Sequence, residues 1–262
     1  MIRVGIGGWT YEPWRGLFYP EKLSKTKELS HASRRVMSIE ANGTFYSTFT
    51  PSTFRRWAEE TPDDFVFSLK APRYAVNRRV LAEAGLSIEK FLASGVSELK
   101  SKLGPILWQL APTKKYDPDD IAAFLELLPK TIDGLKLRHA LEVRNESFRS
   151  ADFIAQVHKA GVAVVLADSQ KYPLIADLSA DFVYARLQDA KTDVETGYSA
   201  KALATWATMA RAWEGGEGPE KFPLAAPKGK PLKSRDVFIY FINGAKERAP
   251  AAAEALIKLL KK

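Results

Sequence analysis

Apolar and polar residues alternate along short segments of the chain, and longer polar or helix-forming stretches separate these segments. In residues 37–42 the odd-numbered positions are apolar, whereas Ser38, Glu40 and Asn42 occupy the even-numbered positions. Successive side chains of a strand point to opposite faces, so Glu40 and Asn42 share one face near the end of this strand. The same division recurs in later segments. This recurrence indicates a closed barrel whose inner face becomes polar near its mouth.

Eight segments of the chain have strand patterns, and helices or helix-length connections separate them. These segments are residues 2–7, 37–42, 65–70, 106–110, 140–144, 162–168, 182–188 and 237–243. Continuous apolar runs such as residues 162–168 are typical of parallel strands that helices cover. No obvious hairpin turn separates any two of the segments. The pattern predicts an α/β fold, a single (β/α)8 TIM barrel with parallel strands, as one domain over residues 1–262.

The connecting segments contain the helices that this fold requires. We expect helices over residues 51–61, 87–102, 118–128, 150–159 and 200–213, and an Ala-rich helix at the end of the sequence. Asp117 is the expected N-cap of the helix that begins at residue 118. Residues 215–235 form a Gly/Pro/Lys-rich insertion before the last strand, which we expect on the amino-terminal face of the barrel.

The carboxyl ends of the strands carry the candidate site, because catalytic groups of TIM barrels come from these ends. The polar residues there are Glu40, Asn42, Lys70, Gln109, Glu142, Arg144, Asp168, Arg186, Gln188 and Asn243. Buried ion pairs add little net stability, so a barrel optimised for stability alone would place apolar residues at these positions. The charged residues therefore favour a functional site, and a purely structural ion network is the alternative.

The amino-acid composition excludes some kinds of chemistry at the carboxyl ends of the strands. The chain has no cysteine and three histidines, none of which lies at the carboxyl end of a predicted strand. A disulfide is excluded, no zinc site of the usual nitrogen and sulfur ligands is expected, and a Ser-His-Asp triad has no base. Mg²⁺ or Mn²⁺ remains an alternative, held by oxygen atoms of Glu40, Glu142 and Asp168, with Asn42 or Asn243 assisting.

The net charge of +8 is spread along the chain, with an excess of four cationic residues in each half. A spread excess is commonly a matter of solubility, so it points only weakly to nucleic acid. The first residues lack the pattern of a signal peptide, and no apolar run reaches the roughly 18 residues of a membrane span. We expect a cytoplasmic protein with no membrane partner.

Aromatic residues are concentrated in residues 8–20, directly after the first predicted strand. Two interpretations of this loop stay open. It forms a self-packed lid over the barrel mouth, or it offers a stacking platform for a base or a sugar ring. In the second interpretation Trp9, Tyr11, Phe45 and Tyr46 are ligand-binding residues.

Four motifs follow one another along the chain: GIGGWTYEPWRGLFYP, IEANGTFYSTFTPSTFRRWAEETPDDFVFSLKAPR, LGPILWQLAP and ALEVRNESF. Together they resemble the barrel family called domain of unknown function 72, or YecE-like. The resemblance spans nearly the whole chain and implies the barrel and a strand-end site, but no established reaction. The chain departs from the family pattern after the third and seventh strands, where relatives often carry a histidine and this chain has Ala75–Asn77 and Arg186–Asp189.

Three functions are compatible with these residues. The first is an enzyme, with hydrolases among the candidates, that acts on a small anionic or phosphorylated ligand. Glu40 or Glu142 would be its general base, and Lys70, Arg144 and Arg186 would stabilise charge, so the predicted catalytic residues are Glu40, Lys70 and Glu142. The second is a nucleic-acid-binding or nuclease-like protein related in fold to barrel DNA-repair enzymes. The third is a glycoside hydrolase with Glu40 and Glu142 as its carboxylate pair.

Overall fold

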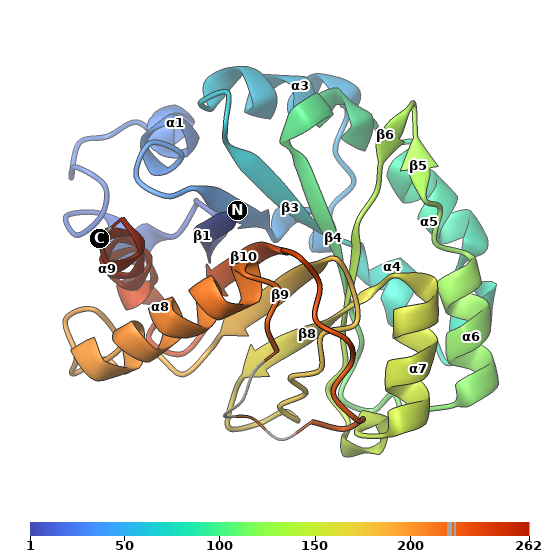
Figure 1. Ribbon diagram of the computed structural model, residues 1–262. Coiled ribbons are helices and arrows are strands. Elements are labelled where there is room, and N and C mark those ends of the chain that lie inside the picture. The colour runs from blue at the N-terminus through green and yellow to red at the C-terminus, as the bar shows by residue number, and fades with distance from the viewer. Residues whose placement is uncertain (219–221, 223, 262) are drawn as a thin grey trace.

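Eight parallel strands form a closed barrel in the computed structural model of the protein, which describes residues 1–218, 222 and 224–261 (Figure 1). The barrel strands are β1 (Ile2–Gly7), β2 (Ser38–Ala41), β3 (Val66–Lys70), β4 (Leu103–Gln109), β7 (His139–Glu142), β8 (Ala163–Asp168), β9 (Phe182–Leu187) and β10 (Asp236–Phe241). Their order around the barrel is β1-β10-β9-β8-β7-β4-β3-β2, and the pairing of β1 with β2 completes the ring. The predicted TIM barrel of parallel strands is confirmed.

Helices surround the strands on the outside (Figure 1). They are α1 (Glu28–Ala32), α2 (Gly43–Tyr46), α3 (Pro51–Glu60), α4 (Arg73–Val76), α5 (Gly85–Leu92), α6 (Pro118–Glu126), α7 (Ala151–Ala160), α8 (Ala200–Glu214) and α9 (Ala249–Leu260). The longer helices bury apolar side chains on one face, as with Trp206 and Trp213 of α8. The side chain of Asp117 caps α6 by accepting a hydrogen bond from the backbone N–H of Asp120, as the sequence predicts.

Two local predictions were wrong. The expected helix over residues 87–102 is divided, because α5 ends at Leu92 and a 3-10 segment, Val96–Lys102, follows Gly95. Gly95 has a φ of 104°, a conformation in which a side chain is strained, and a Cβ there would lie 2.6 Å from the Cα of Pro51.

The second error concerns hairpins. β5 (Thr131–Ile132) and β6 (Leu135–Lys136) pair antiparallel outside the barrel. Asp133 and Gly134 connect them with φ angles of 46° and 77°. Asp-Gly is the residue pair that a two-residue turn with two positive φ angles favours, so the sequence itself contains the signal for this hairpin.

Inward-facing side chains fill the barrel in levels. Phe182 and Phe238 pack edge to face, with 6.1 Å between their ring centres. Two residues further along the same strands, Tyr184 and Tyr240 form the next level, with ring centres 5.1 Å apart. The level after that, at the carboxyl ends of the strands, is charged. The barrel interior thus changes from apolar to ionic along its axis.

The insertion before β10 contacts the segment that precedes β9. Backbone N–H groups of Ala225 and Ala226 donate hydrogen bonds of 2.8 and 3.0 Å to the carboxylate of Asp177, and Arg235 donates one of 3.2 Å to the carbonyl of Ala180. These contacts place the described part of the insertion at the amino-terminal end of the barrel. Residues 219–221 and 223 of the insertion lie outside the described residues. Among the helices that the structure describes, none combines the length and the apolar character needed to cross a membrane.

Candidate functional site

A buried arginine joins two glutamates at the carboxyl ends of the strands. Arg186 of β9 donates hydrogen bonds of 2.9 and 3.0 Å to the carboxylate of Glu40 in β2, and another to Glu142 in β7. The Arg186 side chain is 2% exposed and both glutamate side chains are fully buried. Two parallel N–H bonds match a guanidinium to a carboxylate, so the pair with Glu40 is fixed in orientation. We call Glu40, Glu142 and Arg186 the arginine–glutamate network.

Two further residues complete the hydrogen bonds of Glu142. Gln109 of β4 donates to Oε2 at 2.9 Å, and Arg144, just beyond β7, donates from Nε to Oε1 at 2.8 Å. Burial alone would raise the pKa of Glu142, but the charges of Arg186 and Arg144 and the hydrogen bonds outweigh it and lower the pKa to about 2. Glu142 is therefore ionised throughout the physiological pH range.

Tyr184 also binds the network, although it is not among the site residues predicted from the sequence. Its hydroxyl donates a hydrogen bond of 2.8 Å to Glu40 Oε2 and lies 2.7 Å from the hydroxyl of Ser68. Burial, and then the charge of Glu40, raise the pKa of the Tyr184 phenol, so it remains a hydrogen-bond donor. The signal was present in the sequence, because Tyr184 and Arg186 share one face of the same strand.

Lys70 of β3 lies beside the network without joining it. The residue is 7% exposed, and its Nζ is 4.0 Å from the centre of the Phe45 ring. No hydrogen bond or ion pair links this nitrogen to another of the described residues. Burial, and then the charge of Arg186, lower the pKa of Lys70 to about 8 against the opposing effect of Glu40 and Glu142. The ammonium can therefore exchange its proton close to neutral pH.

Asp168, at the end of β8, lies in a different environment from the arginine–glutamate network. In the strand register Ala167 pairs with Arg186, so Asp168 lies on the opposite face of the sheet. Burial, and then the charge of Asp189, raise the pKa of Asp168 to about 6, while a hydrogen bond with Tyr198 opposes the shift. The structure therefore does not bring Asp168 together with the glutamates of the network.

Three amides selected from the sequence lie around the mouth. Asn42 donates a hydrogen bond of 3.2 Å to the backbone carbonyl of Glu40. Asn243, with a φ of 63°, donates one of 3.4 Å to the side-chain oxygen of Gln188. The Nε2 atom of Gln188 is buried and has no partner among the described residues. These amides belong to the rim of the site rather than to its charged centre.

The aromatic candidates are mostly packed against other rings. Trp9 contacts Trp57 edge to face at 4.9 Å between ring centres, and Tyr11 contacts Trp14 in the same way at 5.4 Å. Trp14 itself is fully buried. Tyr46 differs, because 69% of it is exposed. Tyr11 thus packs within its own loop and Trp9 packs against α3, and the interpretation of the loop as a lid over the barrel mouth stays a prediction.

The positions of the carboxylates test the alternative that Glu40, Glu142 and Asp168 bind Mg²⁺ or Mn²⁺. Arg186 holds both Glu40 and Glu142, the two carboxylates that would form most of an oxygen site. Within the described residues, no three side chains of His, Cys, Asp or Glu are grouped as a metal site requires. The suggested set of Glu40, Glu142 and Asp168 is therefore not assembled in this arrangement.

The fold and the site define a class, that of TIM-barrel proteins with an ionic site at the carboxyl ends of the strands. Within this class the chain belongs to the family described as protein of unknown function DUF72, whose model matches residues 3–262. The resemblance noted in the motifs is thereby confirmed.

Individual relatives are more distant. The chain is 28% identical over 178 residues to the UPF0759 protein YecE of Escherichia coli strain K12, and this match covers 65% of the chain and 60% of YecE. A solved DUF72 family protein from Thermotoga maritima superimposes with a TM-score of 0.77 at 20% identity over all of both chains. Another from Enterococcus faecalis gives 0.72 at 15% identity, covering all of this chain and 96% of the other. These structural likenesses concern the fold alone.

Proposed function

We propose that the protein is an enzyme that acts on a small anionic, phosphate-containing ligand at the carboxyl ends of the barrel strands. The observation that carries the proposal is Lys70, a lysine that is almost completely buried and has no ionic or hydrogen-bonding partner among the described residues. Burying an unpaired ammonium costs free energy, so its place at the mouth of the barrel calls for a functional reason.

The charges around Lys70 support an anionic ligand. Glu40 and Glu142 carry two negative charges, and Arg186 and Arg144 carry two positive charges. These four groups balance one another, so the protonated form of Lys70 leaves one positive charge in excess. An anion that enters the mouth would supply the missing partner in a low-dielectric environment, where the attraction is strong.

The contacts also suggest a chemical role for each of these side chains. Protonated Lys70 would hold the phosphate and donate a proton or a hydrogen bond to the oxygen on which negative charge develops. Glu142, with its pKa lowered to about 2 and three donors around it, is a weak base and acts best by holding Arg186 and Arg144 in place. Glu40 has the same relation to Arg186.

Lys70→Met tests this function, with Lys159→Met, an exposed position of α7, as the matched control. Turnover of a panel of phosphate mono- and diesters should fall by roughly 10²-fold or more in Lys70→Met, the loss typical of a missing acid, and stay unchanged in the control. In the parent, kcat/KM should decline as the pH rises through about 8, because Lys70 then loses its proton. Equal turnover in both variants would refute the proposal.

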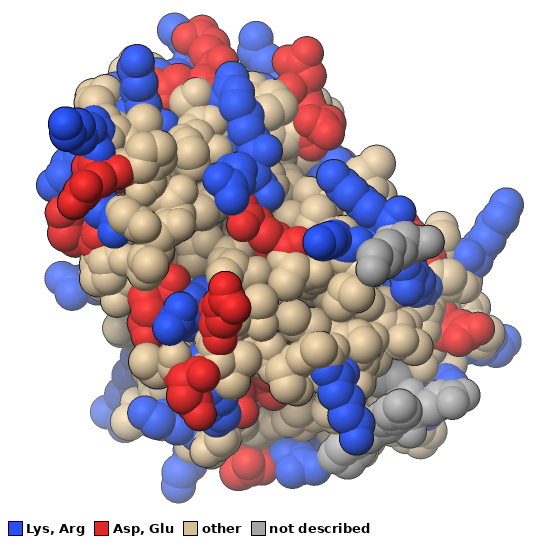
Figure 2. Space-filling view, turned by 90° about the vertical axis from the view of Figure 1, so that its left-hand side faces the viewer, with Lys and Arg blue, Asp and Glu red and all other residues tan. Residues whose placement is uncertain are grey.

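The two other functions stay as predictions with less support. A stacking platform needs accessible rings, and of the candidates Tyr46 is the one with a largely exposed ring. Figure 2 shows basic and acidic side chains interspersed on one face of the molecule, whereas a basic patch or stripe is the usual feature of a nucleic-acid-binding surface. A glycosidase needs a protonated carboxyl, whereas the surroundings of Glu142 lower its pKa to about 2.

A further inference from the structure

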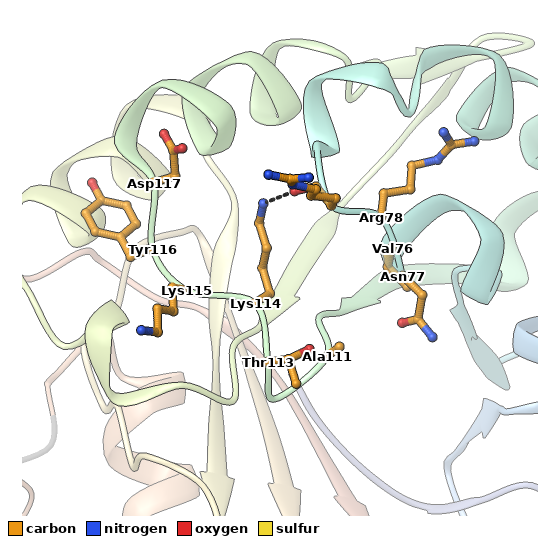
Figure 3. Close-up of a pocket in the computed structure, with 10 residues that line it drawn as sticks. Val76, Asn77, Arg78, Ala111, Thr113, Lys114, Lys115, Tyr116 and Asp117 are labelled. Carbon is orange, nitrogen blue, oxygen red and sulfur yellow. Dashed lines mark hydrogen bonds between the residues drawn. The ribbon is translucent and has the colours of Figure 1, made fainter.

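A cavity of about 730 Å³ opens between two loops at the carboxyl end of the barrel. One wall is formed by residues 76–79, the last residue of α4 and the three that follow it. The other is formed by residues 111 and 113–117, which precede α6 (Figure 3). We call this cavity the basic cleft. Its volume lies within the range of about 300–1,000 Å³ that small-molecule sites occupy.

Four cationic side chains line the basic cleft: Arg78, Arg79, Lys114 and Lys115. The acidic residue that lines it is Asp117, and Asp120 behind the wall forms an ion pair with Lys114. Two positive charges therefore remain after both carboxylates are counted. Asp117 also accepts a hydrogen bond as the N-cap of α6, which leaves its carboxylate less able to neutralise the cleft.

The cations fall into a fixed pair and a free pair. Arg78 donates hydrogen bonds to the carbonyl of Tyr74 at 2.9 Å and to the hydroxyl of Ser87 at 2.7 Å. Lys114 donates to the carbonyl of Arg79 at 2.8 Å (Figure 3), and it also forms the ion pair with Asp120. In contrast, no hydrogen bond or ion pair links the side chain of Arg79 or Lys115 to another described residue. The fixed pair shapes the cleft, and the free pair can bind a ligand.

The cleft adjoins the proposed active site through the chain itself. Its first wall follows β3, whose last residue is Lys70, and its second wall follows β4, whose last residue is Gln109. β3 and β4 are neighbours in the barrel, with Lys70 paired to Leu107. Both walls of the cleft therefore continue from neighbouring strands that carry residues of the proposed active site.

We propose that the basic cleft binds a second phosphate or diphosphate group of the same small-molecule ligand, so that the substrate is anionic at both ends. Arg79 and Lys115 would make the new contacts, since the planar guanidinium of arginine suits phosphate oxygens and lysine adds a point charge. This inference rests on the proposed function, because it places the reacting anion at Lys70. It adds the requirement that the substrate carry a distal anionic group.

Inorganic pyrophosphate is the probe, and calorimetric titration at low ionic strength measures its affinity. The double variant Arg79→Gln/Lys115→Gln should bind pyrophosphate at least roughly tenfold more weakly than the parent, because it lacks two charge-assisted contacts. Lys159→Gln, which removes an exposed charge from α7, should bind like the parent. Unchanged affinity in the double variant, or no binding by the parent, would overturn the assignment.

Lys70→Met separates this inference from the function on which it rests. If the cleft is a separate subsite, Lys70→Met still binds pyrophosphate at a site that Arg79→Gln/Lys115→Gln weakens. If the function at Lys70 is wrong while the cleft is right, phosphate-ester turnover survives in Lys70→Met and pyrophosphate binding stays sensitive to the double variant. A 12-nucleotide single-stranded DNA that binds through Arg79 and Lys115 much more tightly than pyrophosphate would overturn the small-molecule assignment.

Discussion

The arginine–glutamate network and the free pair of the basic cleft, Arg79 and Lys115, contain charged groups in opposite states. In the network every charge is buried and paired, with Arg186 between Glu40 and Glu142. In the cleft, Arg79 and Lys115 are exposed and make no side-chain contacts of this kind with described residues. Paired charges hold one another in a fixed geometry, whereas free charges are available to a ligand. The density of charge alone therefore does not identify the groups that bind a ligand.

Lys70 stands between the two states, since it is buried like the network and unpaired like the cleft. Of the three environments of charge, a buried charge without a partner is the least favourable, because the Lys70 ammonium has lost its water without gaining an ion pair with a carboxylate. The three environments therefore differ in what the removal of a charge should do to the free energy of unfolding. Measurements on variants can test that order.

The largest effect is expected for Arg186→Met. It leaves Glu40 and Glu142 buried without their guanidinium, and the loss of one partner from a buried ion pair costs about 3–5 kcal/mol. Urea denaturation should show a destabilisation of at least this size, or the variant should fail to fold. Adding Glu40→Gln and Glu142→Gln to Arg186→Met should recover part of the loss. If the triple variant is no more stable than Arg186→Met, the network does not act through its charges.

An effect of opposite sign is expected for Lys70→Met. The pKa of Lys70 is lowered to about 8 in the fold, so the folded state binds fewer protons than the unfolded chain between pH 8 and pH 10.5. The free energy of unfolding of the parent should therefore rise over this interval. At pH 7 Lys70→Met should be more stable than the parent by about 2–3 kcal/mol, and the gap should close near pH 10. Denaturation curves at both pH values would check this, and a loss of stability at pH 7 would contradict it.

The smallest effect is expected for Arg79→Gln/Lys115→Gln. Exposed charges without partners add little to the folded state, so the free energy of unfolding should change by less than about 0.5 kcal/mol. The same urea experiment measures it, and the pyrophosphate titration described above then reports on binding in a protein of unchanged stability. A larger loss would mean that the cleft has a structural role, which would weaken its contrast with the network.

Much of the fold follows from the sequence because the strands carry a clear period-two pattern. The placement of Glu40, Lys70, Gln109, Glu142 and Arg186 at one end of the barrel follows from that pattern and from the parallel order of the strands. The sequence pattern does not tell which of these side chains form ion pairs with one another. The ion pair of Arg186 with Glu40 depends on the closure of the barrel and on side-chain conformation. Asp168 was placed with the others because it ends a strand, yet one residue of register moves it to the opposite face.

The basic cleft was not predicted because its residues lie in loops. Arg79 and Lys115 are far apart in the sequence and belong to no periodic segment. Their proximity arises from the adjacency of β3 and β4 and from the path of each loop, which hydrogen bonds such as that from Lys114 to the Arg79 carbonyl determine. The sequence pattern predicts well which face of a strand a residue occupies, but it does not predict which loops lie close together in the fold.

The pairing of β1 with β10 has a consequence for how the protein is made. The pairs Ile2–Val237 and Ile6–Phe241 join strands from opposite ends of the sequence. During synthesis β1 leaves the ribosome long before β10, so the edge of β1 that pairs with β10 stays without its partner until β10 follows. Unpaired strand edges attract other chains, and contacts between distant residues form slowly. In the interval before β10 appears, the nascent chain is therefore exposed to association with other chains at this edge.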